Sequence, residues 1–485
     1  MKVAMCSTEA VPFAKTGGLA DVVGALPSAL GKVGVECFVI MPYYNSIFGK
    51  DYRFKKVRNK LNVSMNESNE EFFDLLSLKH EGISFYFIKK DEFFDRNYLY
   101  GTPKGDYKDN GKRYSFFSKA ILEVLEELDL GVDVIHLNDY HCGLVPIYLR
   151  EIRENDLPGK DFFKNTSTVF TIHNLAYQGI FQKEILEYNG LGYKYFKIDG
   201  LEFYGKINFM KGAILFSDKI TTVSPTYAKE ILTPQYGHDL DGISRSRQRD
   251  LSGIVNGIDY MAWDPRQDNK IVKNYNINSL TGKKECKDFL VDNYFNKRFR
   301  DKPLIGAVTR LSEQKGIDLI IDAIEEISGN DFLLIILGTG EDKYHKVLKK
   351  LHKKYEGSLC AHILYDDRLA RRIYSGSDLF LMPSKYEPCG LGQLISLRYG
   401  TVPVVRDTGG LSDTIKDIKT EGDIEEGGTG FKFKEYKSAS MVEALDRVLP
   451  FYENGRLWNK IVKNGMNSDF SWKNSAELYK KLYEG

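Results

Sequence analysis

The segment VAMCSTEAVPFAKTGGLADVVGALPSAL, residues 3–30, decides the fold. It opens with the apolar run Val3–Cys6, which is typical of a buried strand. It then passes through a loop containing Lys15–Asp21 and continues as a helical stretch over Leu19–Leu30. A strand followed by a glycine-containing turn and a helix is the beginning of a βαβ unit, and repeated βαβ units predict a parallel sheet.

The same alternation continues along the first half of the chain. Further strands are expected at Cys37–Met41, Val132–Leu137, Thr168–Ile172 and Lys219–Val223. Residues 52–90 break the alternation, because three strand-like runs follow one another without a helix. These runs, Phe54–Val63, Phe72–Leu78 and Ile83–Ile88, predict an antiparallel insertion.

The pattern restarts after a turn-rich passage at Val255–Asp259 and Trp263–Pro265. Strands are expected at Leu304–Val308, Phe332–Leu337, His362–Tyr365, Leu379–Met382 and Val402–Val405. The sequence therefore predicts an α/β protein with two doubly wound, Rossmann-like domains joined near residues 253–263. Ligands of such sheets bind outside the carboxyl ends of the strands, and two domains facing each other would place a cleft between them.

Composition excludes several classes of protein. The chain has 485 residues, 42% of them apolar, and 68 basic residues stand against 67 acidic ones. This balance argues against disorder and against nucleic acid as the main partner. There is no apolar stretch of the roughly 18 to 20 residues that span a membrane, and the first residues are too short an apolar run for a signal peptide. Six scattered cysteines suit a reduced cytoplasm and predict no zinc site.

Two loops that follow predicted strands carry cations. In Lys15–Asp21, paired glycines at the start of a helix would let backbone N–H groups approach an anion, although the same residues suit a tight turn that binds nothing. The loop matches neither the dinucleotide fingerprint nor the P-loop. After the strand at Leu304–Val308, Arg310 and Lys315 suit a diphosphate; the alternative is two solvated surface charges.

A third loop, Pro383–Leu391, places Glu387 just before amides that would hold a phosphate or a sugar. A carboxylate there would repel an anion, so it suits sugar hydroxyls or a developing positive charge; the alternative is a helix-start acid. A fifth loop, Arg406–Leu411, again has paired glycines and could bind another part of a ligand.

The fourth set contains histidines at the carboxyl ends of first-domain strands. Metal binding by His136, Asp139, His141 and His173 is conceivable, but their spacing matches no zinc pattern, and structural hydrogen bonding is the alternative. No serine-hydrolase elbow is present. Together, the sequence places five polar or glycine-rich loops at the carboxyl ends of strands in two similar domains. This arrangement favours a nucleotide sugar or another phosphorylated ligand in an interdomain cleft.

With these motifs in this order, the chain resembles the bacterial glycogen synthases and plant starch synthases over nearly its whole length. The motifs are Lys15–Asp21, His136–Asp139, Thr171–Asn174, Val255–Asp259, Arg310 with Lys315, Glu387–Leu391, Thr408–Leu411 and Phe470–Trp472. The resemblance implies the GT-B architecture, with two Rossmann-like domains facing a deep cleft. It assigns 1–252 to an acceptor and catalytic domain, 253–262 to a hinge, 263–465 to a nucleotide-sugar-binding domain and 466–485 to a helix that crosses back.

The resemblance also implies a cytoplasmic transferase that moves glucose from ADP-glucose to the non-reducing end of an α-1,4-glucan, retains the anomeric configuration, and needs no metal or other cofactor. Its partners would be ADP-glucose and glycogen or a maltooligosaccharide, with no nucleic acid and no membrane. By motif, the catalytic set is Lys15, Asp139, His173, Arg310, Lys315 and Glu387. Donor binding adds Gly18, Asn256, Tyr365, Cys389, Gly390 and Leu391, and the acceptor side consists of Asp21, Tyr100 and Asp139.

Two positions depart from the family pattern. Ile395 stands where related glycosyltransferases often carry a second glutamate, as expected for the bacterial glycogen synthase branch, and Gly392 stands where many relatives have a larger or polar residue. Two alternatives stay open: a UDP-glucose-dependent glucosyltransferase of the same fold, and a non-catalytic glucan-binding protein. Intact Lys15, Arg310, Lys315 and Glu387 argue against the second alternative.

Overall fold

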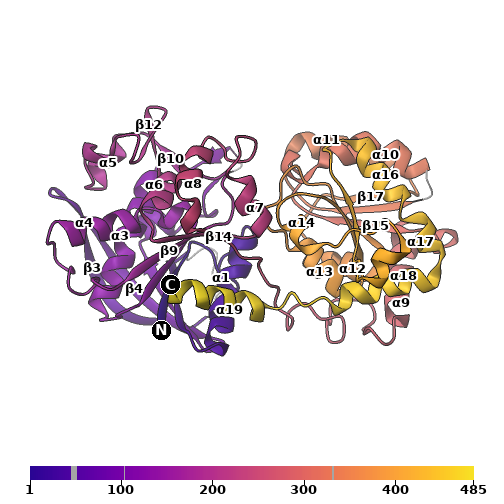
Figure 1. Cartoon of the computed structure of the whole chain (residues 1–485), viewed down its shortest axis with the longest axis horizontal. Helices are drawn as coiled ribbons and strands as arrows, with labels where there is room; N and C mark the ends of the chain where they lie inside the picture. Colours follow the sequence, from indigo (N-terminus) through magenta and orange to yellow (C-terminus); the bar gives the residue numbers. More distant parts are fainter. Residues whose placement is uncertain (45–51, 103, 330–331) are drawn as a thin grey trace. The chain divides into compact units, whose positions relative to one another are not determined.

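The computed structural model describes residues 1–44, 52–102, 104–329 and 332–485. The chain divides into two compact units (Figure 1). The first consists of Met1–Asn256 together with Trp472–Gly485, and the second consists of Gly257–Ser471. Among the described residues, no helix combines the length and the apolar character needed to cross a membrane.

The sheet of the first unit has the order β14-β13-β9-β8-β1-β2-β5-β4-β3 in the described part of the chain. Its parallel strands are β1 (Lys2–Cys6), β2 (Glu36–Pro42), β5 (Ile83–Lys89), β8 (Val134–Asn138), β9 (Ser167–Ile172), β13 (Lys219–Thr222) and β14 (Leu251–Gly253). The predicted insertion is confirmed, because β3 (Lys55–Asn66) and β4 (Asn69–His80) pair antiparallel with each other and β4 pairs antiparallel with β5. Strand order reverses between β1 and β8, which makes this the switch point of the sheet.

Helices cover this sheet because their apolar residues recur at helical spacing. The first helix, α1 (Gly18–Lys32), buries Leu19, Val22, Val23, Leu26 and Leu30. The last helix, α19 (Trp472–Glu484), packs on α1, and its Lys480 Nζ donates to the Val33 carbonyl at 3.0 Å. The other helices are α2 (Asp91–Phe94), α3 (Asn110–Glu127), α4 (Val145–Glu154), α5 (Ile185–Tyr188), α6 (Phe209–Phe216), α7 (Pro225–Glu230) and α8 (Asp241–Ser246). A small sheet joins β10 (Ile180–Phe181), β12 (Lys206–Asn208) and β11 (Glu202–Phe203), and β6 (Gly101–Thr102) pairs with β7 (Gly105–Asp106).

The second unit contains a parallel sheet with the order β17-β16-β15-β18-β19-β20 among its described residues. The strands are β15 (Leu304–Val308), β16 (Leu333–Leu337), β17 (Leu359–His362), β18 (Leu379–Met382), β19 (Val402–Arg406) and β20 (Phe431–Phe433). The predicted strand at His362–Tyr365 is wrong by three residues. Leu359 and Cys360 pair with β16, whereas Leu364 and Tyr365 lie exposed beyond the edge strand.

Strand order again reverses in the middle, here between β15 and β18. The helices of this unit are α9 (Thr281–Tyr294), α10 (Ile317–Gly329), α11 (Asp342–Lys354), α12 (Asp367–Gly376), α13 (Gly392–Arg398), α14 (Gly409–Thr414), α15 (Glu421–Glu425), α16 (Ser438–Asp446), α17 (Leu449–Glu453) and α18 (Gly455–Asn467).

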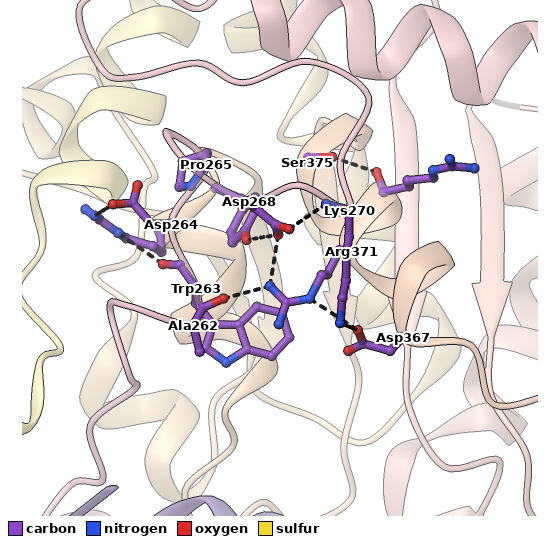
Figure 2. A network of polar contacts seen from close by, with 12 residues as sticks. Ala262, Trp263, Asp264, Pro265, Asp268, Lys270, Asp367, Arg371 and Ser375 are labelled. Carbon is purple, nitrogen blue, oxygen red and sulfur yellow. Dashed lines mark hydrogen bonds and ion pairs between the residues drawn. The ribbon is translucent and has the colours of Figure 1, made fainter. Parts of the chain in front are cut away.

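A polar network fixes the turn-rich passage at the start of the second unit to α12 (Figure 2). The Arg371 guanidinium donates to the Ala262 carbonyl at 2.7 Å and to Asp268 Oδ2 at 2.9 Å. It also lies 4.1 Å from the centre of the Trp263 ring, a cation–π contact. Because Arg371 belongs to α12, residues 262–268 are held by the core of the second unit.

Candidate active site

The predicted site residues fall into two clusters, one in each unit, and most of them follow the strands at the switch point of their sheet. The first cluster lies in the first unit: Lys15, Gly18 and Asp21 follow β1, Asp139 follows β8, His173 follows β9, and Tyr100 lies between α2 and β6. The second cluster lies in the second unit, mainly after β15 and β18, and consists of Arg310, Lys315, Tyr365, Glu387, Cys389, Gly390 and Leu391. Asn256 ends the first of the two segments that form the first unit.

In the loop after β1, two of the amides expected to face an anion are already occupied. The Glu9 carboxylate accepts hydrogen bonds from the backbone N–H of Thr16 at 2.5 Å and of Gly17 at 3.2 Å. Sequence reasoning missed Glu9, because a single glutamate after a strand carries no recognisable pattern. The loop therefore holds an internal anion, and its outward-facing positive charge is Lys15.

Lys15 forms an exposed ion pair with Asp21, with 2.7 Å between Nζ and Oδ1. Burial raises the pKa of Asp21, and the ammonium of Lys15 opposes that shift. Exposed pairs of this kind contribute about 0–1 kcal/mol, so a phosphate could take the place of Asp21 on Lys15 at little cost.

Asp139 and His173 meet where β8 and β9 end. Asp139 has a φ of 58°, an uncommon conformation for a residue with a side chain, and its Oδ1 accepts from the His173 N–H at 2.8 Å. Burial raises the pKa of Asp139 to about 7. The strained backbone and the raised pKa are the pattern found at functional carboxyl groups.

The tautomer of His173 follows from its neighbours. Asn138 donates through Nδ2 to the Cys6 carbonyl at 3.0 Å, so its Oδ1 must be the acceptor at 2.8 Å from His173 Nε2. Burial lowers the pKa of His173 to about 3, which keeps the ring neutral. Nε2 therefore carries the hydrogen, and Nδ1 is the ring's acceptor for a hydroxyl.

The remaining histidines of this region have structural partners. His136 bonds Tyr483 at 2.7 Å and Thr171 at 2.6 Å, and burial lowers its pKa to about 3. The His141 ring stacks on Tyr100, with 4.6 Å between centroids. Within the described ranges, no group of three or more His, Cys, Asp or Glu side chains could hold a metal ion.

The second cluster is organised around a buried ion pair. Lys315 Nζ lies 2.6 Å from Glu387 Oε2, and the two side chains are 17% and 6% exposed. Ser384 Oγ donates to the same carboxylate oxygen at 3.0 Å. The loops that carry the pair approach closely at Gly316, whose φ is +70° and where a Cβ would lie 2.1 Å from the Pro383 carbonyl oxygen. Glycine is required there.

Other residues of this cluster are placed by their loops. The Arg310 guanidinium donates through Nη2 to Gln314 Oε1 at 3.3 Å. Tyr365 is 84% exposed after β17 and offers a flat ring to solvent. Gln393 Nε2 donates to the carbonyls of Cys389 and Gly390, at 2.9 and 3.0 Å, and so fixes the turn that precedes α13.

The predicted loop Arg406–Leu411 holds the predicted loop Pro383–Leu391 in place. Arg406 is buried, and its guanidinium donates to the carbonyls of Ser384 and Lys385, at 3.4 and 2.6 Å, and to that of Lys434 at 3.2 Å. The Gly410 N–H donates to the Glu387 carbonyl at 3.0 Å. The sequence showed a cation and paired glycines at a strand end, but not that they turn towards the neighbouring loop.

Comparisons with known proteins identify the architecture of both units. The model of the starch synthase catalytic domain matches residues 2–246, about half of the chain, and the model of group 1 glycosyl transferases matches residues 292–467. A glycogen synthase of Thermosipho melanesiensis is 43% identical over 486 residues, covering 100% of this chain and 98% of the relative. The chain belongs to the glycogen and starch synthase family.

Further relatives of the family agree with this assignment. Glycogen synthase 2 of Geobacter sulfurreducens is 44% identical, with the same coverage. The solved catalytic domain of starch synthase IV from Arabidopsis thaliana, bound to ADP and acarbose, is 31% identical with a TM-score of 0.89, and the match covers 100% of this chain and 98% of that one. The sucrose-phosphate synthase of Thermosynechococcus elongatus, at 16% identity and a TM-score of 0.62, shares the fold. The predicted resemblance, the GT-B architecture and the assignment as a glycosyltransferase of the glycogen synthase type are confirmed.

Proposed function

We propose that the enzyme transfers glucose from ADP-glucose to the non-reducing end of an α-1,4-glucan, with retention of the anomeric configuration. The observation that carries the proposal is the Lys315–Glu387 pair. It places a cation suited to phosphate 2.6 Å from a carboxylate suited to sugar hydroxyls, as the junction between phosphate and sugar in a nucleotide sugar requires. The relative starch synthase IV is described as bound to ADP and acarbose, which supports both the nucleotide and the glucan.

The Lys315 ammonium has three donors, of which one binds Glu387, so two remain for the leaving phosphate. Arg310 adds a guanidinium that can bind two phosphate oxygens at once. Glu387 still has its second oxygen, Oε1, as an acceptor for glucose hydroxyls. Both charges are anchored by loops of a rigid sheet, which is how an enzyme pre-organises electrostatic stabilisation.

In the first unit, we assign His173 to the donor glucose, because its neutral ring presents Nδ1 as an acceptor. Asp139, Asp21 and Tyr100 would line the acceptor side, as the resemblance implies. The bond between the anomeric carbon and the phosphate oxygen breaks, and the acceptor hydroxyl oxygen bonds that carbon from the same face. The hydroxyl proton passes to the departing phosphate, so the products are ADP and a glucan one unit longer. The side chains supply position and charge.

The exposed Tyr365 ring would stack on the adenine. Base stacking on an aromatic side chain contributes about 1–3 kcal/mol and tolerates different bases, so Tyr365 alone does not select adenine over uracil.

The test compares radiolabelled ADP-glucose and UDP-glucose as donors to glycogen, and determines the anomeric configuration of the new linkage by NMR. Transfer from ADP-glucose into α-linkages supports the proposal. Faster transfer from UDP-glucose would contradict the donor assignment, β-linkages would contradict retention, and glycogen binding without transfer from either donor would make the chain a glucan-binding protein.

A further inference from the structure

Glu9 is the most densely hydrogen-bonded carboxylate near the first cluster, and neither its sequence context nor the reaction assigns it a role. Glu9 is buried, with 3% of the residue exposed. Oε2 accepts from the N–H groups of Thr16 and Gly17, at 2.5 and 3.2 Å. Oε1 accepts from Thr16 Oγ1 at 2.6 Å and from the Tyr100 hydroxyl at 2.5 Å. Two segments more than 80 residues apart therefore meet on one carboxylate.

The backbone of Glu9 is itself fixed. Its N–H donates to Ser7 Oγ at 3.1 Å, and Ser7 Oγ donates to the Glu9 carbonyl at 2.8 Å. The next residues turn back on themselves, because the N–H of Ala10 bonds the carbonyl of Ala14 and that of Val11 bonds the carbonyl of Ala20. Glu9 thus projects from a rigid support directly after β1.

On the loop side, Glu9 holds the two residues that lead into α1. The N-cap residue is Gly17, which has no side chain to cap the helix. Unpaired N–H groups at a helix start attract an anion, and α1 has 15 residues whose peptide dipoles add to this attraction. A carboxylate that binds Thr16 and Gly17 fixes the turn between Lys15 and Gly18, and with it the starting point of the Lys15 side chain.

The Tyr100 segment, which forms the other contact of Glu9, is also fixed by hydrogen bonds. Thr8 Oγ1 lies 2.9 Å from the Tyr100 hydroxyl, and Asn110 Nδ2 donates to the Tyr100 carbonyl at 2.8 Å. The fully buried Arg113 donates to the Leu99 carbonyl at 2.9 Å. These bonds tie the Tyr100 segment to α3 and deliver its hydroxyl to Glu9.

We propose that Glu9 is a positioning residue that couples Tyr100, on the acceptor side, to the donor loop Lys15–Gly18. The coupling rests on the roles proposed above for Lys15 and Tyr100. Glu9 touches neither substrate in this scheme. Instead, a Tyr100 displaced by a misplaced acceptor would release one of the bonds that hold Glu9, and the donor loop would lose part of its support.

A double-mutant cycle with Glu9→Gln and Tyr100→Phe tests the coupling. Gln keeps one acceptor oxygen but puts an NH₂ group against N–H and O–H donors, so kcat/KM for the donor should fall about 10–100-fold, the range for losing hydrogen bonds to a charged group. If Tyr100 acts through Glu9, the double variant should lie within about threefold of Glu9→Gln alone. Independent, multiplying losses would overturn the proposal.

Hydrogen exchange supplies a readout that does not depend on turnover. The amides of Thr16 and Gly17 should exchange at least about tenfold faster in Glu9→Gln, while the amides of β1 keep their protection, because the loss is local. Thr16→Val removes only the Thr16 Oγ1 bond from an exposed residue, so it should fold and show a smaller increase. Glu36→Gln removes the same charge from an exposed site of the same unit and should leave both exchange and turnover unchanged.

Two further outcomes would overturn the proposal. One is unchanged exchange at Thr16 and Gly17 in Glu9→Gln. The other is a Glu9→Gln variant that raises KM for glycogen alone, since this would place Glu9 on the acceptor itself. If wild-type enzyme transferred glucose from neither ADP-glucose nor UDP-glucose, the proposed function would fail, and the exchange measurement would still decide the role of Glu9.

Discussion

Replacing Lys315 with Ala should destabilise the second unit as well as impair the reaction. The substitution leaves Glu387, whose side chain is 6% exposed, with Ser384 Oγ as its remaining partner among the described contacts of its carboxylate. Removing one partner of a buried ion pair costs about 3–5 kcal/mol. Because Lys315 keeps 17% exposure, water can enter, and we expect the lower end, about 3 kcal/mol. For a unit the size of Gly257–Ser471, this lowers Tm by about 6–12 °C.

A second substitution separates stability from catalysis. In Lys315→Ala/Glu387→Gln no buried charge is left unpaired, so most of the lost stability should return. Activity should stay low, since loss of charged contacts to the transition state costs about 1.5–4 kcal/mol, or about 10–1000-fold in kcat/KM. Unfolding can be followed by tryptophan fluorescence, because Trp263 and Trp458 both belong to the second unit.

The control is Lys385→Ala, which breaks an ion pair of similar length between the same two loops. Lys385 and Glu313 are 2.7 Å apart, but their side chains are 50% and 54% exposed, so the loss should stay below about 1 kcal/mol. If Lys315→Ala were as stable as Lys385→Ala, or if the double variant were no more stable than Lys315→Ala, the reasoning from a buried ion pair would be refuted.

Four further predictions follow from individual residues. Burial raises the pKa of Asp139 from 3.8 to about 7, so the stability linked to its bound proton is present below about pH 4 and is lost as pH rises to about 7; the Tm of wild type relative to Asp139→Asn should therefore fall between about pH 4 and pH 7 and level off above that. Arg406→Lys replaces a planar fork with a shorter side chain that should lose at least one of the three carbonyl contacts, so ADP affinity, measured by calorimetry, and kcat/KM should each fall about tenfold. Tyr365→Ala should raise KM for the donor about tenfold with little change in kcat, as expected for lost stacking. Activity should survive exhaustive treatment with EDTA; a loss that magnesium reverses would contradict the assignment of phosphate binding to side chains.

Much of the fold could be predicted because parallel strands buried on both faces give continuous apolar runs. Leu304–Val308 and Leu379–Met382 were predicted with the bounds that the structure shows. The predictions failed where hydrogen bonding between strands, rather than the local sequence, decides which residues form a strand. His362–Tyr365 is as apolar as a strand, yet the sheet pairs the preceding residues, and the three-residue strand Phe431–Phe433 gave no signal of its own.

The candidate site was predictable to the level of loops, but not of contacts. Residues after parallel strands gather at one edge of a sheet, and so Lys315 and Glu387 could each be singled out. That they form an ion pair across 72 residues follows from the approach of two loops at Gly316, which no spacing in the sequence encodes. The contacts of Glu9 and Arg406 escaped prediction for the same reason: both side chains bind a neighbouring loop, and the residues next to them in the sequence do not reveal it.

Glu9 and Arg406 also explain why the two clusters offer different chemistry. In the first unit a carboxylate occupies N–H groups of the donor loop, so an anion arriving there meets the Lys15 side chain on a fixed turn. In the second unit a guanidinium and Gln393 occupy carbonyl oxygens of the Glu387 loop, which are the groups that would repel a phosphate. We infer that the second unit provides most of the binding energy for the diphosphate. Under the roles proposed above, the first unit contributes the Lys15 cation, whose effect depends on its position, and the proposed role of Glu9 is to fix that position.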